Sequence, residues 1–235
     1  MVSGPDRLAP DHMLTVGAAL PLLPITATFG YYGLPDSFRE LLLVQFAPQV
    51  LAYIALGLWA TRATQVTIQL GLEKEKIRSG LQWGVLTGLF LGSLNTFVIL
   101  AVYPHLGYDI TFLKQTPHGR LPVLLMVPWL ICGIALFVEV NFRGFLLGRL
   151  AELASHWRGT DSRQRPALFA LAVSSLTFAF DPFMVNTFQH LHWIALWDGL
   201  IWGTIWLRTR NLWITIVADA IEVIILYSAV KAAIG

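Results

Sequence analysis

Two oppositely charged side chains, Glu139 and Arg143, lie inside an apolar stretch long enough to cross a lipid bilayer. Ionisable groups at such depth are costly to bury, so in membrane proteins they are candidates for function. Their four-residue spacing places a carboxylate and a guanidinium on one face of a helix. The pair could therefore belong to a catalytic centre, or it could be an ion pair whose two charges neutralise each other inside a helical bundle.

The composition around this pair is that of a membrane protein. Hydrophobic residues make up 56% of the 235 residues and charged residues 13%. Apolar runs of about 20 residues recur between short polar breaks, as in membrane-crossing helices, whereas the strands of an outer-membrane barrel would alternate apolar and polar residues. We therefore predict an all-α fold, a polytopic transmembrane helical bundle. The net charge of +2 gives no indication of nucleic-acid binding.

The bundle is predicted to have about seven spans, each of roughly 20 residues. The first span is expected to be retained, because no small-residue cleavage pattern follows it. The polar segment 62–80 suits an interfacial cytoplasmic helix or a solvated loop with helical tendency. We divide the chain into amino-terminal helices with this segment, 1–120, and a core, 121–235. The predicted spans are 13–33, 41–60, 81–103, 121–149, 166–183, 187–207 and 212–230.

Lysine and arginine are distributed unevenly between the two sides that these spans define. Most cations fall on one side, which places the amino terminus in the cytoplasm and the carboxyl terminus outside the cytoplasmic membrane. The cations on the predicted cytoplasmic side are Arg7, Arg62, Lys74, Lys76, Arg78, Arg158, Arg163, Arg165, Arg208 and Arg210, and those on the other side are Arg39, Lys114, Arg120 and Lys231.

Acidic side chains from four predicted spans share a layer near the middle of the membrane. Asp219 and Glu222 lie three residues apart on one helix face, and Ser174, Phe178 and Asp181 form another stripe. Because five carboxylates and one arginine cannot all stay charged in a low dielectric, we expect these faces to line a polar cavity open toward the cytoplasm. The predicted depths are roughly 12 to 17 Å for Glu139, Asp198, Asp219 and Glu222 and roughly 22 Å for Asp181.

Three segments of the carboxy-terminal half carry a family resemblance. They read VEVNFRGFLL at Val138 to Leu147, SSLTFAFDPF at Ser174 to Phe183, and GLIWGTIWLRTRNLWITIVADAIEV at Gly199 to Val223. The words FRGFLL, SSL.F and LRTRNLW resemble, in order and spacing, the CAAX-protease and bacteriocin-processing (CPBP, or ABI) family of intramembrane metalloproteases. The resemblance covers about 121–227. It implies a CPBP-like core in which Glu139 and Arg143 are remnants of the catalytic centre.

The chain departs from the family pattern at the residues that carry the chemistry. Val138 stands where the family has its first glutamate. The resemblance implies that this glutamate is the base that activates water. Pro182 stands at the first histidine, Asp219 replaces the second histidine, and Val223 replaces the final asparagine or aspartate. A hydrolytic zinc needs imidazole donors, an open coordination position and a nearby carboxylate. We therefore predict no zinc site from these positions.

Other ligands for a metal are conceivable. If an ion binds among Asp181, Asp219 and Glu222, magnesium or calcium suits these oxygen donors better than zinc. His190 and His192 could supply displaced ligands, but their spacing of two puts them on different helix faces. With the neighbouring tryptophans they also fit an aromatic belt at the membrane surface.

Small residues recur at four-residue spacing on two spans, where they let helix backbones approach closely. They predict internal packing of the bundle, and binding of a partner is the second interpretation. The residues are Gly84, Gly88 and Gly92 on one span and Gly199 and Gly203 on another.

Together these features predict a catalytically impaired CPBP-like integral membrane protein. It would act as an accessory or scaffold subunit, binding a membrane helix, a lipid or a partner protein through the former substrate cavity, with no cofactor. The alternative is an active CAAX-type intramembrane metalloendopeptidase that holds zinc through shifted ligands. A third interpretation is an ion or proton pathway through the acidic layer.

Overall fold

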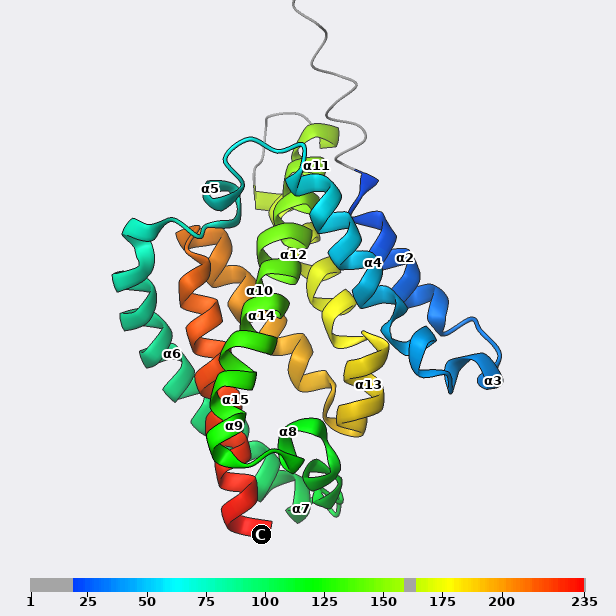
Figure 1. Cartoon of the computed structure of the whole chain (residues 1–235), viewed down its shortest axis with the longest axis vertical. Coiled ribbons are helices and arrows are strands. Elements are labelled where there is room, and N and C mark those ends of the chain that lie inside the picture. The colour runs from blue at the N-terminus through cyan, green and yellow to red at the C-terminus, as the bar shows by residue number, and fades with distance from the viewer. Residues whose placement is uncertain (1–18, 159–163, 235) are drawn as a thin grey trace, which may run out of the picture.

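The computed structural model describes residues 19–158 and 164–234, and the regular elements in these two ranges are all helical (Figure 1). The predicted all-α fold is therefore confirmed. Successive long helices run in alternating directions between two ends of the molecule. One end carries α5 (Val66–Leu70), and the other carries α8 (Pro117–Arg120) and the carboxyl terminus. We call them the α5 end and the α8 end.

The amino-terminal helices α2 (Leu22–Tyr31) and α4 (Leu42–Ala60) lie side by side, joined near the short helix α3 (Asp36–Arg39) (Figure 1). After α4 the predicted amphipathic segment 62–80 is not one helix. Left-handed backbone at Gln65 and Gly71 limits α5 to five residues. The chain then turns into α6.

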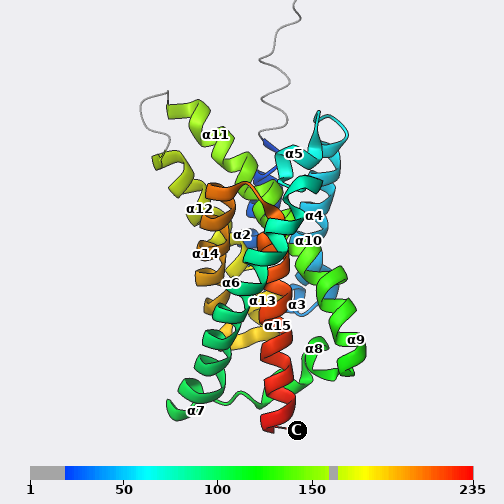
Figure 2. The same cartoon turned by 90° about the vertical axis from the view of Figure 1, so that its left-hand side faces the viewer.

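Helices α6 (Ile77–Phe97) and α15 (Leu212–Ile234) pack closely, and both views show them side by side (Figures 1 and 2). A Cβ atom on Gly84 would lie 2.9 Å from the carbonyl oxygen of Ile214, and one on Gly88 would lie 2.7 Å from that of Ala218. Such contacts are possible only with glycine. The predicted packing role of this glycine stripe is confirmed.

The second pair of small residues packs α14 (Trp193–Thr209) against α12 (Gln164–Ala179). A Cβ atom on Gly199 would lie 2.9 Å from the Cβ atom of Ser175, and Gly203 faces Leu171. These glycines therefore also serve contacts inside the bundle, as predicted.

The long central segment winds unevenly between the two ends. Its first part reaches α10 (Leu136–Glu139), and its second part passes through the π-helical segment Val140–Leu147 into α11 (Gly148–Arg158). π-Helical turns are uncommon and are often found at functional sites. This one carries Arg143 and begins directly after Glu139, so the helix irregularity coincides with the buried charged pair.

Helix α12 ends at Ala179, and α13 (Pro182–Phe188) continues at an angle of 52°. The break follows from the local sequence. Asp181 accepts a hydrogen bond from the backbone nitrogen of Phe183 at 3.0 Å and caps α13, whose first residue is Pro182. The predicted stripe of Ser174, Phe178 and Asp181 on one helix is therefore wrong at its last member, which lies beyond the end of α12.

The length and apolarity of the described helices do not confirm the predicted number of membrane crossings. Among the described residues, four helical segments are long and apolar enough to cross a membrane, or five if the bent pair α12 and α13 forms one span. Helix α14 has 17 residues and α2 has 10, fewer than the roughly 20 that a crossing needs. The predicted count of seven is not confirmed. The four segments are Leu42–Ala60, Val66–His105, Leu124–Ser155 and Leu212–Ala233.

Two lysines from the two predicted sides, Lys76 and Lys231, lie at opposite ends of the molecule (Figure 1). At the α5 end, Lys76 Nζ donates to the carbonyl oxygen of Arg210 at 2.9 Å. At the α8 end, Lys231 Nζ donates to the carbonyl oxygens of Gly119 and Leu121 at 2.6 and 2.8 Å. Which end faces the cytoplasm stays a prediction.

Candidate functional site

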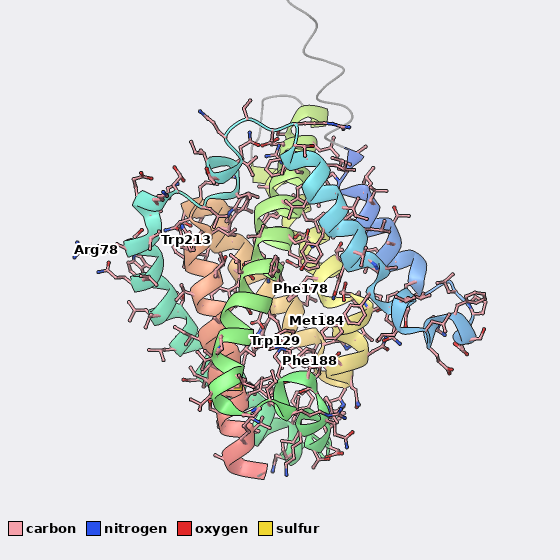
Figure 3. All side chains as sticks on the ribbon, in the orientation of Figure 1. Arg78, Trp129, Phe178, Met184, Phe188 and Trp213 are labelled. Carbon is pink, nitrogen blue, oxygen red and sulfur yellow. The ribbon has the colours of Figure 1, made fainter. Side chains whose placement is uncertain are left out.

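The Glu139 and Arg143 pair lies in the interior of the bundle. Arg143 Nη1 is 3.0 Å from Glu139 Oε1, and the two side chains are 2% and 0% exposed. The guanidinium also lies 4.4 Å from the centre of the Phe178 ring, which α12 supplies from within the bundle (Figure 3). Stacking on an aromatic ring is a favoured environment for arginine. The carboxylate and the ring together fix the position of the Arg143 charge.

Three further acidic residues lie near this pair. Asp219 is within electrostatic range of Glu139, Arg143 and Asp198, and Glu222 is within range of Asp198 and Asp219. Asp198 and Glu222 are buried, and Asp219 is partly buried. The structure therefore brings together four of the five acidic residues that the sequence analysis grouped. We call Glu139, Asp198, Asp219 and Glu222 the acidic cluster.

Asp181 has other partners. Its Oδ1 atom accepts a hydrogen bond from Gln49 Nε2 of α4 at 2.9 Å, in addition to the capping bond with Phe183. These bonds tie the amino-terminal helix α4 to the bend between α12 and α13. The structure thus gives Asp181 a structural role as a helix cap and places it outside the acidic cluster, against our expectation.

Asn95 of α6 is a member of the site that the sequence analysis missed. Its Nδ2 atom donates to Asp198 Oδ1 at 3.1 Å and also to Glu222 Oε1. Asn95 lies 103 and 127 positions from these partners, so no local pattern joins them. One signal was present: Asn95 follows Gly92 by three residues, which places it on the glycine face of α6 that packs against α15.

The best-formed surface hollows of the described residues lie elsewhere. One is lined by apolar side chains around Leu125 and Trp129 near α9 (Val123–Pro128), and another lies around Trp83 on the outer face of α6. Neither is lined by a member of the acidic cluster. The polar cavity that we predicted there is not confirmed.

The residues present do not fit a catalytic zinc ion. Across 19–158 and 164–234, no three histidine, cysteine, aspartate or glutamate side chains are arranged to hold a metal. The positions aligned with the family's two histidines carry Pro182 and Asp219 instead of nitrogen donors, and Val223 replaces the final asparagine or aspartate. In addition, the Arg143 guanidinium lies beside Glu139, where its positive charge would repel a metal cation. No hydrolytic step is therefore assigned to this site.

The two histidines considered as displaced ligands lie in an aromatic cluster. The His190 ring stacks at 5.5 Å on Tyr103 and at 5.2 Å on Tyr108, measured between ring centres. His192 Nδ1 is 2.5 Å from the carbonyl oxygen of Gln189. These contacts support the aromatic-belt interpretation of this segment and give neither histidine a place in the acidic cluster.

A third histidine, His118 of α8, is buried against Tyr227, with 5.1 Å between the ring centres. Burial lowers the pKa of His118 from 6.5 to about 4. Protonation is then easier in the unfolded chain than in the folded protein, so stability is complete above pH 6.5 and is lost as the pH falls toward 4.

We expect the free energy of unfolding in detergent to fall by about 2 kcal/mol between pH 7 and pH 5 through this group. A His118→Phe variant keeps an aromatic ring on Tyr227 and should show a weaker fall, measured as the unfolding midpoint against pH. Identical pH profiles for the two proteins would show that His118 is not the group responsible.

A family model described as type II CAAX prenyl endopeptidase Rce1-like matches residues 120–224. The matched range includes the charged pair, the bend after α12, and α14 and α15 as far as Ile224, but not α6 with Asn95. Comparisons with curated proteins and with solved structures gave no match.

The fold and this match define the class as a helical membrane protein of the CAAX protease type. The match over residues 120–224 supports the membership in the CPBP family that the sequence motifs predicted. Its apolar helices are in contact with lipid.

Proposed function

We propose that this protein is a catalytically impaired CPBP family member that binds a membrane partner as an accessory or scaffold subunit. The observation that carries the proposal is the contrast between a retained family framework over 120–224 and the exchanged residues at its reactive positions.

The geometry around Glu139 supports this interpretation. Its carboxylate is buried and ion-paired with Arg143 at 3.0 Å, so the one glutamate that the family motif retains is held in a charge pair within the bundle. Val138, at the position of the family's first glutamate, carries no proton acceptor. The two positions that the family gives to its glutamates therefore hold an apolar side chain and a buried ion pair, which supports binding over catalysis.

The partner that we propose is a transmembrane helix of another protein or a lipid chain, bound where the former substrate cavity faces the membrane. Apolar side chains on the outside of the bundle suit such a partner, because helices associate in lipid through close packing. We place the protein in the cytoplasmic membrane with its α5 end toward the cytoplasm. The distribution of lysine and arginine supports this orientation.

Zinc analysis combined with a cleavage assay tests the proposal. We expect protein purified without chelators to hold far less than one zinc per chain. It should cleave a prenylated CAAX peptide or a membrane-spanning peptide no faster than its Glu139→Gln variant does. Stoichiometric zinc, together with cleavage that this variant loses, would contradict the proposal and establish the alternative, an active metalloendopeptidase with shifted ligands.

Purification in mild detergent tests the accessory role separately. We expect the protein to elute as a stable complex with a second membrane protein. Elution as a single chain from membranes of its own cells would contradict that part of the proposal.

A further inference from the structure

Asp198 and Glu222 form a buried pair of carboxyl groups without a cationic partner. Both lie within hydrogen-bonding distance of the one side-chain nitrogen of Asn95, and they are 9% and 7% exposed. Within the described ranges, no ion pair joins either of them to lysine, arginine or histidine. The nearby Arg143 is paired with Glu139. Two carboxyl groups this close in a low dielectric cannot both be ionised unless a cation lies between them; otherwise one of them holds a proton.

With both carboxyl groups ionised, two oxygen atoms of this group also have no hydrogen-bond partner among the described residues. They are Asn95 Oδ1 and Glu222 Oε2, both buried. Buried polar atoms are nearly always partnered, and an exception calls for a bound ion, a water molecule or a functional explanation. These unpartnered acceptors, beside a pair of carboxyl groups, are atoms that a bound cation would use as ligands.

The chemistry of the donors selects the kind of ligand. Carboxylate and amide oxygens are hard donors, which favour magnesium and calcium over zinc. The side-chain amide of asparagine has nearly the same shape after a rotation of 180°, which exchanges its nitrogen and oxygen. With an ion present, Asn95 can thus turn its carbonyl oxygen toward the position that its nitrogen otherwise faces.

We propose that Asn95, Asp198 and Glu222 form a binding site for a small hard cation, coordinated by the two carboxylates and by the side-chain oxygen of Asn95. A divalent ion fits the charge best, because the acidic cluster with Arg143 sums to −3 when fully ionised (four acids and one base). The site uses none of the positions aligned with the family's metal ligands, and Asn95 lies outside the matched range 120–224. It is therefore independent of the proposed function.

The ion would join three helices, since Asn95 lies on α6, Asp198 on α14 and Glu222 on α15. Binding to the folded state alone raises the unfolding temperature in proportion to the logarithm of the ion concentration once the site is saturated. The proposal thus predicts an ion-dependent stability that does not require any enzymatic activity.

The test is thermal unfolding of the purified full-length protein in detergent after treatment with EDTA. We expect MgCl2 or CaCl2 to raise the unfolding midpoint by several degrees, and NaCl and KCl at equal ionic strength to have a smaller effect. The Asn95→Leu and Glu222→Gln variants should lose this increase. As matched controls, Asn186→Leu and Glu75→Gln change exposed residues and should keep it.

A direct measurement on the unaltered protein covers the case in which the variants do not fold. Titration with Mn2+, followed by electron paramagnetic resonance, should show one saturable site from which Mg2+ displaces the manganese. No saturable binding would overturn the proposal and leave a shared proton as the positive charge of the pair. Saturable binding that persists in Asn95→Leu and Glu222→Gln would overturn it too, because the ion would then lie elsewhere.

Discussion

Replacing Arg143 with methionine is expected to lower the free energy of unfolding by about 3 to 5 kcal/mol, the typical cost of removing one partner from a buried ion pair. Methionine can fill much of the space along the aliphatic part of the arginine and against Phe178, so the main loss is the positive charge. The Glu139 carboxylate, 0% exposed, would then be left with no compensating cation. Equilibrium unfolding in detergent or bicelles, followed by helix content, measures the effect.

Two further variants separate the loss of charge from the loss of packing. The double variant Glu139→Gln with Arg143→Met removes both charges and should recover most of the stability, because neutral residues can replace a buried pair at little cost. Arg39→Met breaks a pair with the exposed Asp36 and should cost at most about 1 kcal/mol. If Arg143→Met were as mild as Arg39→Met, Glu139 would have to be protonated in the folded protein.

The features that the sequence predicted well are local or periodic. Glu139 and Arg143 are one helical turn apart, and the glycines of α6 recur on one face. Because helical spacing determines which residues share a face, each pattern predicts the relative positions of its members. The family words FRGFLL and SSL.F likewise lie within single helices, and LRTRNLW joins the end of α14 to the start of α15. Patterns of this kind need no knowledge of how distant helices pack.

The features that were missed depend on long-range packing or on a turn signal that was not used. The contact between Asn95 and the acids on α14 and α15 requires the arrangement of three helices. Asp181 is different, because the order aspartate then proline is a local signal for a helix start. The charge and the predicted depth of Asp181 favour a continuous span instead, and a prediction based on them extends α12 too far.

The substitution Gly88→Ala is expected to destabilise the bundle by about 1 to 3 kcal/mol, the usual cost of overpacking a tight interior. The added methyl group would lie 2.7 Å from the carbonyl oxygen and 2.9 Å from the Cα atom of Ala218. Both atoms belong to the backbone of α15 and cannot rotate away, so the two helices must separate. The midpoint of unfolding in detergent measures the change.

Gly57→Ala is the matched control, because a Cβ atom at this position of α4 would meet nothing within 4 Å. Alanine favours a helix over glycine by up to about 1 kcal/mol, so this variant should be neutral or slightly more stable. The two identical changes are therefore expected to have opposite signs, which no general preference for alanine can produce. The separation caused by Gly88→Ala should also draw Asn95, two turns further along α6, away from Glu222. A Gly88→Ala protein as stable as Gly57→Ala would mean that α6 and α15 do not approach this closely, and the contact of Asn95 with the acidic cluster would lose its support.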